Sequence, residues 1–418
     1  MADLVVELSG ARVGRLSGDW RTFDFVADPH AIERYGIDSL VISVAMPLAA
    51  ISNRARRDRR QNFFHELLPE GQMLRQLAQQ AGVPPHDVIG LLRAFGRDLA
   101  GALQIWDPDR PGEPLQPAVV PLTDHDVAIM LKEVRRDPLG NQVPTGKTSL
   151  AGVQDKIVLV RNEMGWNRAL DGWPSSHIVK PESRDYPTMI YDEEYGSRFA
   201  RMLGLTAFAT SLETFDGVPA IVIERYDRSP ETPDGRIHQE DFNQALGASG
   251  NEKYQRFGGR VSLANIARVI ATAGGHDSLT RLFKLVALSI AVGNLDLHAK
   301  NISLLHFQDG SIELAPAYDV VPQAHLPNDR QVALAVAGEF QHAALTRNML
   351  IAEGHTWGLR SAEVLTDTAL EQVLELARAE GPDDRAHPGL AEDIATFASN
   401  LLEGRSAGRP TSTNQRSD

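Results

Sequence analysis

Residues 287–305, ALSIAVGNLDLHAKNISLL, form a polar turn between two apolar segments. Gly293 and Asn294 end the first apolar run, and Ile302 begins the second. The titratable and amide side chains within this turn are Asp296, His298, Lys300 and Asn301. A turn held between two core-forming segments places reactive side chains on a rigid support. We therefore expect this stretch to carry the chemistry of the protein, with the rest of the chain arranged around it.

Four residues separate Asp296 from Asn301, which is the spacing of the protein-kinase catalytic loop. In that loop the Asp accepts the proton of the attacking hydroxyl group, and the Asn holds a magnesium ion. About one such pair is expected by chance in a chain this long. The alternative for Asp296 is a carboxylate that caps its own turn, so the catalytic interpretation needs support from further residues.

Asp319 supplies a second carboxylate downstream of this turn. It lies in LAPAYDVV, after an apolar, strand-like run at 312–315 and a stop at Pro316. Magnesium prefers hard oxygen ligands and keeps several waters, so one carboxylate, one amide oxygen and nucleotide phosphates are sufficient. We predict Asp319 and Asn301 as magnesium ligands, with hydrogen bonding within turns as the alternative.

A lysine at the end of a predicted strand is the candidate for holding the phosphates. Residues 175–180, SSHIVK, predict a strand that ends at Lys180, and residues 191–203 predict a helix with acidic residues in its first turn. In kinases a strand lysine paired with a helix glutamate aligns the phosphates. The sequence leaves the partner of Lys180 open among Asp192, Glu193 and Glu194. All three also favour a helix N-terminus on their own.

A small, glycine-containing loop precedes the strand predicted at 156–160. Its sequence, TGKTSLAGVQDK, starts at residue 145. Backbone N–H groups cradle phosphates where no side chain obstructs the approach, which favours Gly152. We predict phosphate contacts from the backbone amides of Ala151, Gly152, Val153 and Gln154.

His298 lies two residues after Asp296, where eukaryotic kinases carry a phosphate-contacting lysine. We expect His298 near the transferred phosphoryl group, with a structural histidine bonded to backbone carbonyls as the alternative. The 13 histidines include no HxxxH or HxH arrangement, so the sequence does not favour a zinc site.

Taken together, these segments resemble the HipA family of serine/threonine kinase toxins from bacterial toxin–antitoxin modules. The resemblance follows the order of the family over residues 145–321, in the segments SLAGVQDK, HIVK, IERYDR, QEDFNQALG, GNLDLHAKN and LAPAYDV. In addition, FFHELLPEG at 63–71 and FGRDLAGAL at 95–103 resemble the N-terminal subdomain of the family.

The resemblance implies an α+β, bilobal protein-kinase-like (HipA-like) fold with an additional N-terminal α/β subdomain and a mostly helical C-terminal lobe. It implies transfer of the γ-phosphoryl group of ATP, with Mg²⁺, to a protein serine. Asp296, Lys180 and His298 then belong to the catalytic site, and the backbone of Glu224 to Tyr226 meets adenine.

By resemblance, Ser149 occupies the family's autophosphorylation site. A phosphate there would repel the phosphates of ATP and expel the loop. The alternative is an ordinary loop serine.

The resemblance also implies partners. These are a HipB-like helix-turn-helix antitoxin dimer, operator DNA reached mainly through that antitoxin, and an aminoacyl-tRNA synthetase as substrate, typically the glutamyl enzyme. Growth arrest is the implied outcome, and no membrane partner is expected. Two other classes stay open, a catalytically inactive co-repressor scaffold and a small-molecule or lipid kinase of the same fold.

Composition sets the remaining limits. The 418 residues include no cysteine, so disulfides and cysteine nucleophiles are excluded. No apolar run approaches the roughly 20 residues that span a bilayer, and the acidic start does not resemble a signal peptide, so we expect a cytoplasmic protein. The net charge of −13 argues against a free-standing duplex-DNA binder.

We expect five parts along the chain. Residues 1–106 form the N-terminal subdomain, with strands near 4–8, 11–16, 22–26 and 40–46 and helices in 62–95. A linker at 107–122 leads to the small lobe at 123–225, with a helix at 124–136, and to the helical lobe at 226–402. Residues 403–418 are expected to be disordered. The arginine-rich run at 53–61 predicts a solvated surface, with a docking patch for a partner or DNA as the alternative.

Overall fold

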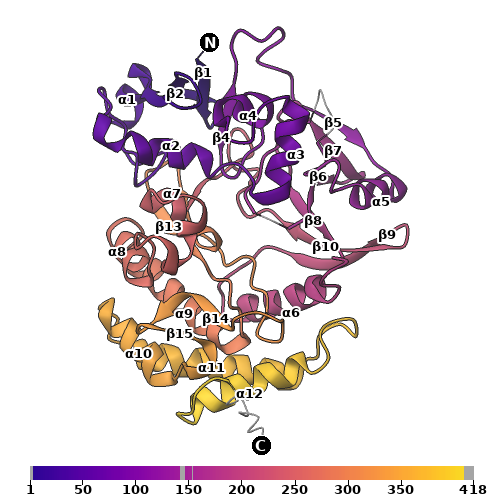
Figure 1. The fold of residues 1–418 in the computed structure, drawn as a ribbon, viewed down its shortest axis with the longest axis vertical. Coiled ribbons are helices and arrows are strands. Elements are labelled where there is room, and N and C mark those ends of the chain that lie inside the picture. Colours follow the sequence, from indigo (N-terminus) through magenta and orange to yellow (C-terminus); the bar gives the residue numbers. More distant parts are fainter. Residues whose placement is uncertain (1–2, 142–145, 153, 409–418) are drawn as a thin grey trace, which may run out of the picture.

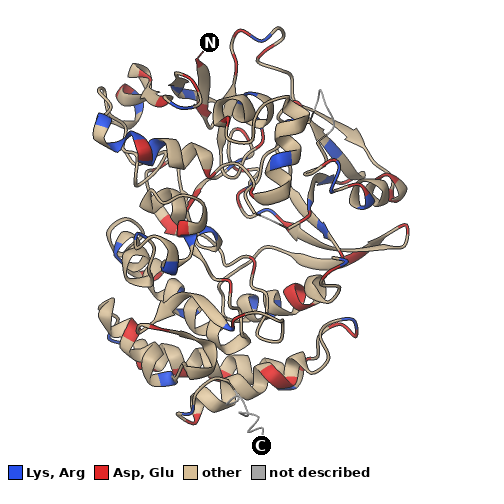
Figure 2. Ribbon diagram, in the orientation of Figure 1, with Lys and Arg blue, Asp and Glu red and all other residues tan. Residues whose placement is uncertain are grey.

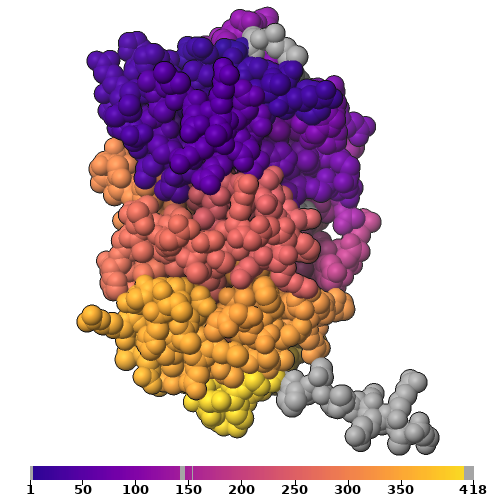
Figure 3. All heavy atoms as spheres, turned by 60° about the vertical axis from the view of Figure 1, so that its left-hand side comes forward, coloured from indigo at the N-terminus to yellow at the C-terminus, as the bar shows by residue number. Residues whose placement is uncertain are grey.

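The computed structural model describes residues 3–141, 146–152 and 154–408. Figure 1 shows an N-terminal subdomain at one end, a small lobe beside it and a mostly helical lobe at the other end. In the space-filling view of Figure 3 the N-terminal subdomain lies directly on the middle part of the chain.

The N-terminal subdomain is built on an antiparallel sheet of order β3-β2-β1-β4. Its strands are β1 (Leu4–Leu8), β2 (Ala11–Ser17), β3 (Asp24–Ala27) and β4 (Leu103–Trp106). Its helices are α1 (Pro29–Tyr35), η1 (Arg54–Arg56), α2 (Arg57–His65), α3 (Gly71–Ala81) and α4 (Val88–Phe95). The apolar core of this subdomain also takes in Leu139, Leu150 and Val158, so it continues beneath the loop predicted to hold phosphates.

The small lobe contains a six-stranded sheet of order β5-β7-β6-β8-β10-β9. Its strands are β5 (Ala118–Pro121), β6 (Ile157–Asn162), β7 (Gly165–Leu170), β8 (His177–Pro181), β9 (Thr210–Phe215) and β10 (Val218–Glu224). Its helices are α5 (Asp124–Lys132) and α6 (Met189–Met202). A capping box between Thr123 and Asp126 begins α5.

The helical lobe has a large apolar core, to which α6 contributes Tyr191, Tyr195 and Phe199. Its helices are α7 (Phe242–Leu246), α8 (Leu263–Ala273), α9 (Gly275–Val292), α10 (Arg347–Thr356), α11 (Ala362–Ala379) and α12 (Leu390–Leu402). Short strands form two small sheets, β11 (His238–Asp241), β12 (Ser303–His306) and β13 (Ile312–Leu314) in one, and β14 (Gln331–Val336) and β15 (Glu339–Gln341) in the other. Short 3-10 turns are η2 (Gly250–Lys253), η3 (Gln255–Phe257), η4 (Ala299–Asn301) and η5 (His342–Ala344).

Several expected elements differ from the structure. Residues 40–46 form turns and bends instead of a strand, because Ser43 and Val44 bond to the carboxylate of Glu240 rather than to a neighbouring strand. The strand β5 lies inside the range expected to be a linker, and the helix expected at 124–136 ends at Lys132. Helix α1 and strand β7 were not expected, although Asp28 caps α1 and Pro29 stands at its start.

The predicted disorder from residue 403 is wrong for residues 403–408. Ser406 pairs with Thr346 in a β-bridge, and the buried Ala407 donates its N–H to the Leu345 carbonyl at 2.8 Å. Residues 409–418 lie outside the described part of the chain. Among the residues that are described, no helix has the length and apolar character needed to span a membrane.

Candidate active site

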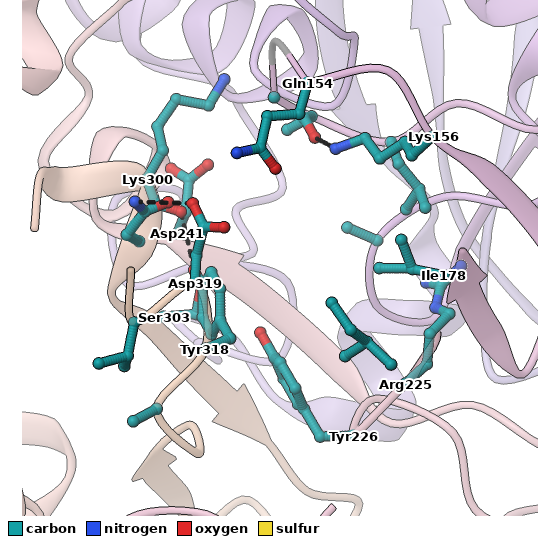
Figure 4. A pocket seen from close by; sticks show the side chains of 18 of the residues that line it. Gln154, Lys156, Ile178, Arg225, Tyr226, Asp241, Lys300, Ser303, Tyr318 and Asp319 are labelled. Atoms are coloured by element: carbon teal, nitrogen blue, oxygen red, sulfur yellow. Dashed lines mark hydrogen bonds between the residues drawn. The ribbon is translucent and has the colours of Figure 1, made fainter. Parts of the chain in front are cut away.

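A pocket of about 270 Å³ lies where the three parts of the chain meet. Figure 4 shows Lys156 and Ile178 on one side of it, and Asp319 and Tyr318 on the other. Glu66, from the N-terminal subdomain, also lines the pocket. The described residues therefore converge on one cavity from all three parts.

The turn after α9 is built on Gly293. This residue ends the helix with φ of 70°, and a Cβ there would lie 2.8 Å from the Cβ of Ala324. The side chain of Asn294 accepts the N–H of Asp296 at 3.1 Å. Farther along, the side-chain amide Nδ2 of Asn301 donates to the backbone carbonyl of Asp296 at 2.9 Å. These bonds fix the backbone on both sides of the Asp296 side chain.

The carboxylate of Asp296 is held near the pocket by Tyr254, whose hydroxyl donates to Oδ1 at 3.1 Å. Burial raises the pKa of Asp296 to about 6, and the negative charge of Asp319 adds to this effect. The side chain still has 38% of its surface exposed. Asp296 is thus an accessible carboxylate with more than ordinary basicity.

Asp319 lies beside Asn301 and Lys180. Lys180 Nζ donates to Oδ1 at 3.0 Å, and Asn301 Nδ2 donates to Oδ2 at 3.2 Å. Burial would raise the pKa of Asp319, but Lys180 outweighs it and the pKa is lowered. The backbone of Asp319 has φ of 55°, a conformation that costs on the order of 1–3 kcal/mol for residues other than glycine and clusters at functional sites.

The partner of Lys180, which the sequence left open, is Glu193. Lys180 Nζ donates to its two carboxylate oxygens at 2.7 and 3.0 Å. Burial would lower the pKa of Lys180, but the carboxylates of Asp319 and Glu193 outweigh it and raise the pKa. Glu194 instead pairs with Arg198 at 2.8 Å. Asp192 accepts a hydrogen bond from the Thr188 hydroxyl at 2.8 Å, so these two candidates are excluded as partners here.

Gly152 and Lys156 define the loop next to the pocket. Gly152 has φ of 113°, and a Cβ there would lie 2.7 Å from Lys156 Nζ. That ammonium donates to the Ala151 carbonyl at 2.6 Å. Burial lowers the pKa of Lys156 to about 8, with repulsion from Lys180 as the next cause. Gln154 also lines the pocket, whereas Val153 lies outside the described residues.

Sequence reasoning did not select Lys156, although it is the residue at which the phosphate loop passes into β6. Its position at the end of a glycine-containing loop could have indicated that Lys156 lies near the phosphates.

Ser149 is fully buried on the other side of this loop. Its hydroxyl donates to the Leu67 carbonyl at 3.0 Å, and its N–H donates to the Asp98 carbonyl at 3.0 Å. Both acceptors belong to the N-terminal subdomain. Ser149 does not line the pocket, so its phosphorylation by a nucleotide bound there would require the loop to leave its place.

The hinge after β10 contributes a ring to the pocket. Tyr226 stacks on Tyr318 with 5.4 Å between ring centroids, and its hydroxyl bonds to Gln239. The N–H of Glu224 is already bonded to the Ala209 carbonyl at 2.9 Å. Tyr226 thus reaches the pocket with its side chain (Figure 4), whereas the resemblance assigned a role only to its backbone.

His298 is buried, and burial together with the charge of Lys253 lowers its pKa to about 3. Its ring packs edge-on against Tyr254, with centroids 5.3 Å apart. The imidazole is therefore neutral near pH 7. It lies beside Asp296, with 3.9 Å between Nε2 and Oδ2, but it brings no positive charge to the pocket.

Lys300 lines the pocket, but its ammonium is held by the N-terminal subdomain. It bonds to Glu66 at 2.7 Å and lies 3.0 Å from Glu70. Sequence reasoning missed Glu66, Glu70 and Tyr254, because their partners are distant in the chain. The only signal was that Glu66 and Glu70 belong to FFHELLPEG, one of the segments resembling the family.

The arginine run at 53–61 is not a uniform solvated face. Arg60 is buried and bonds to Asp24 at 2.6 and 2.9 Å, whereas Arg54, Arg56 and Arg59 are exposed. Figure 2 shows Lys and Arg positions in blue along α2. The run thus combines one structural arginine with an exposed basic surface.

Comparisons with known proteins agree with this arrangement. A family model described as the HipA N-terminal domain matches residues 4–106, and one described as the HipA-like C-terminal domain matches residues 148–380. The chain is 32% identical over 302 residues to the putative kinase Y4mE of Sinorhizobium fredii, covering 70% of each. It is 28% identical over 366 residues to the serine/threonine-protein kinase toxin HipA of Shewanella oneidensis, covering 81% of this chain and 79% of the relative.

Among solved structures, the complex of Shewanella oneidensis HipA, HipB and operator DNA contains a chain that matches with a TM-score of 0.74 and 24% identity over 96% of both chains. This match confirms the predicted fold class, a kinase-like fold with a helical C-terminal region.

Proposed function

The chain belongs to the HipA family of kinase toxins, and from this premise we propose that it transfers the γ-phosphoryl group of ATP to a serine of a protein. The observation that carries the proposal is the meeting of four side chains at one pocket, namely Asp296, Asn301, Asp319 and Lys180. The same four residues argue against a catalytically inactive co-repressor scaffold.

In the proposed reaction the serine hydroxyl oxygen attacks the γ-phosphorus of ATP. The bond from that phosphorus to the bridging oxygen breaks, ADP leaves, and the hydroxyl proton passes to the carboxylate of Asp296. The raised pKa of Asp296, about 6, suits this role because a general base works best when its pKa lies near the operating pH. Lys180, which stays charged, holds the phosphates in line.

Magnesium fits the residues beside the phosphates. Asp319 is ionised because Lys180 lowers its pKa, and Asn301 offers an amide oxygen. Magnesium is usually held by one or two carboxylates together with phosphates and waters, so Asp319 and Asn301 would hold it. When bound, it would neutralise charge on the β- and γ-phosphates.

For ATP itself, we propose that adenine lies between Ile178 and the rings of Tyr226 and Tyr318, which line the same pocket. The phosphates then extend toward the amides of Ala151, Gly152 and Gln154. Lys156 lies beside this loop with its ammonium on the Ala151 carbonyl. It is a second cation available to the phosphates, and binding would exchange that carbonyl for a phosphate oxygen.

We propose the family's partners for this chain as well. The solved Shewanella complex holds HipA together with HipB and operator DNA, which supports a HipB-like antitoxin that brings the toxin to DNA. An aminoacyl-tRNA synthetase, such as the glutamyl enzyme, is the proposed protein substrate, and growth arrest is the proposed outcome. Ser149 is the proposed site of self-phosphorylation, after the loop has left the Leu67 carbonyl.

The test is incubation of the purified chain with γ-labelled ATP and glutamyl-tRNA synthetase, followed by mass spectrometry. The control is the same chain carrying Asp296→Asn. We expect label on the synthetase and on Ser149, and none with the variant or after removal of magnesium with EDTA. Absence of label on every protein would favour the co-repressor scaffold. Label found only on soluble metabolites would favour a small-molecule kinase.

A further inference from the structure

The short connection between α2 and α3 reaches into the active site from the N-terminal subdomain. It contains Glu66 and Glu70, and both line the pocket. The Glu66 side chain has 1% of its surface exposed and that of Glu70 has 21%. Charged groups of this kind are rarely buried unless they are paired.

The first contact of this connection is with the catalytic turn. Lys300 lies directly before Asn301 in η4, and its ammonium bonds to Glu66 at 2.7 Å and lies 3.0 Å from Glu70. Burial would lower the pKa of Lys300, but Glu66 and the other nearby carboxylates outweigh it and raise the pKa. Lys300 is therefore charged and held by two carboxylates from another part of the molecule.

The second contact is with residues 250–254. The Gly250 N–H donates to Glu66 at 2.8 Å, and Lys253 donates to Glu70 at 2.9 Å. Tyr254 follows at once, and its hydroxyl holds the carboxylate of Asp296 at 3.1 Å. The same two glutamates thus fix the segment that orients the proposed base.

The third contact is with the phosphate loop. The backbone N–H of Glu70 donates to the Gly152 carbonyl at 3.3 Å. One connection of the N-terminal subdomain therefore bonds to three segments that line the pocket, and those segments come from distant parts of the sequence.

We propose that Glu66 and Glu70 are positioning residues of the active site, which hold Asp296 in place through Lys300 and through the pair Lys253 and Tyr254. This inference rests on the proposed function. It gives the N-terminal subdomain a role in phosphoryl transfer, the positioning of Asp296, which the motifs of the two kinase lobes do not indicate. Such positioning matters because a shift of about 1 Å in a reacting group can cost about 100-fold in rate.

Glu240 provides a matched control. It is a fully buried glutamate that also joins the N-terminal subdomain to the helical lobe, and it accepts hydrogen bonds from the Ser43 hydroxyl at 2.5 Å and the Val44 N–H at 2.8 Å. His306 lies on its other side at 2.9 Å. None of these three partners lines the pocket. Glu240 itself does not line the pocket, although its neighbours Gln239 and Asp241 do, so Glu240→Gln weakens contacts between the parts through side chains that lie outside the pocket.

The experiment compares Glu70→Gln, Glu66→Gln and Glu240→Gln in the full-length chain, each on a Ser149→Ala background that prevents self-phosphorylation. The probes are ATP and glutamyl-tRNA synthetase. For Glu70→Gln we expect kcat to fall by about 10- to 100-fold, with the KM for ATP changed by less than about threefold, because Lys180 and Asp319 are untouched. Glu66→Gln should act in the same direction. Glu240→Gln should lower the melting temperature and leave kcat within about twofold.

Two further measurements separate positioning from general loosening. Hydrogen exchange should become faster in residues 250–257 and 294–301 of Glu70→Gln, but not in Glu240→Gln. On a Tyr254→Phe background, Glu70→Gln should cost less in kcat than on the native background, because both changes break one chain of contacts. Fully additive losses would overturn the route through Tyr254.

Equal losses of kcat in Glu70→Gln and Glu240→Gln would overturn the proposal, as would unchanged kcat and exchange in Glu70→Gln. If the unmodified chain transfers no phosphate to any acceptor, the proposed function fails. The exchange measurement then still decides whether the two glutamates hold the turn at Asp296.

Discussion

The buried carboxylates at the hinge and the partly buried Asp296 at the pocket have opposite pKa shifts. At the hinge, Asp98 and Asp227 are surrounded by Arg225 and Arg228, with Arg225 2.7 Å from Asp227 and Arg228 2.9 Å from Asp98. At the pocket, Asp296 faces another carboxylate and a tyrosine hydroxyl. Burial acts on all three carboxylates, but the positive charge that outweighs it at the hinge has no equivalent beside Asp296.

The pKa directions express this difference. Burial would raise the pKa of Asp98 and Asp227, but the arginines outweigh it and both pKa values are lowered. The pKa of Asp296 is raised to about 6. The hinge carboxylates therefore stabilise the fold in their charged form at neutral pH, whereas the charged form of Asp296 destabilises it. Paired charges therefore stabilise the hinge, whereas the proposed base at the pocket keeps a raised pKa.

The largest expected effect comes from Asp296→Asn. Loss of the base should lower kcat for phosphoryl transfer by about 10²- to 10⁴-fold. Because the charged form of Asp296 is disfavoured by burial, the variant should keep or slightly raise the melting temperature at pH 7. Steady-state kinetics and thermal unfolding measured side by side would test this. A large loss of stability would contradict the inference that the charged form of Asp296 destabilises the fold.

Asp227→Asn should lower the stability of the fold and change kcat little, the converse of Asp296→Asn. It removes one of the two carboxylates that face Arg225 and Arg228, and removal of one member of a buried pair costs about 3–5 kcal/mol of unfolding free energy. Urea unfolding monitored by circular dichroism would measure that loss. The kcat of the protein that remains folded should change little, and a fall comparable with that of Asp296→Asn would show that the hinge cluster also serves the chemistry.

The pH dependence should separate the two clusters further. Asp296 is protonated below its pKa of about 6, so kcat/KM should fall about tenfold per pH unit below that value and level off above it. The hinge carboxylates, with lowered pKa values, stay charged in this range. Rates measured from pH 5.5 to 8, with circular dichroism at each pH, would show whether activity falls before the fold does.

Tyr254→Phe should have the smallest effect on stability and a specific effect on the pH dependence of the rate. The hydroxyl hydrogen bond is among the influences that lower the pKa of Asp296, so its loss should shift the acidic midpoint of the rate profile to higher pH. The fold should be little affected, since only one partly buried hydroxyl is removed. An unshifted midpoint, measured on the same pH series, would mean that Tyr254 does not act on the base.

The sequence predicted which residues line the pocket better than it predicted which residues hold them in place. Asp296, Asn301, Asp319 and Lys180 were found because spacing within a loop and position at a strand end are local signals. The choice of Glu193 over Glu194 was not available, because consecutive helix residues point about 100° apart and only the rotation of α6 against β8 decides which one faces the lysine.

Contacts across the chain were out of reach for a different reason. Glu66 and Lys300 are 234 residues apart in the sequence, and no periodicity links them. In the same way, residues 40–46 alternate like a strand, but the distant Glu240 binds their polar groups and no neighbouring strand pairs with them. At residues 40–46 a tertiary contact overrode the local pattern. For Glu66 and Lys300 no local pattern indicated the contact.

The bonds from Glu66 and Glu70 to Lys300 and Lys253 limit how this gene could be shortened or divided. A fragment that starts after residue 106 would expose Lys300 and Lys253 without the carboxylates of Glu66 and Glu70, and Arg225 and Arg228 without the carboxylate of Asp98. We expect such a fragment to fold stably only when residues 1–106 are supplied as a separate chain. A recombination event or engineered fusion that replaces the first hundred residues would have to keep both glutamates in register.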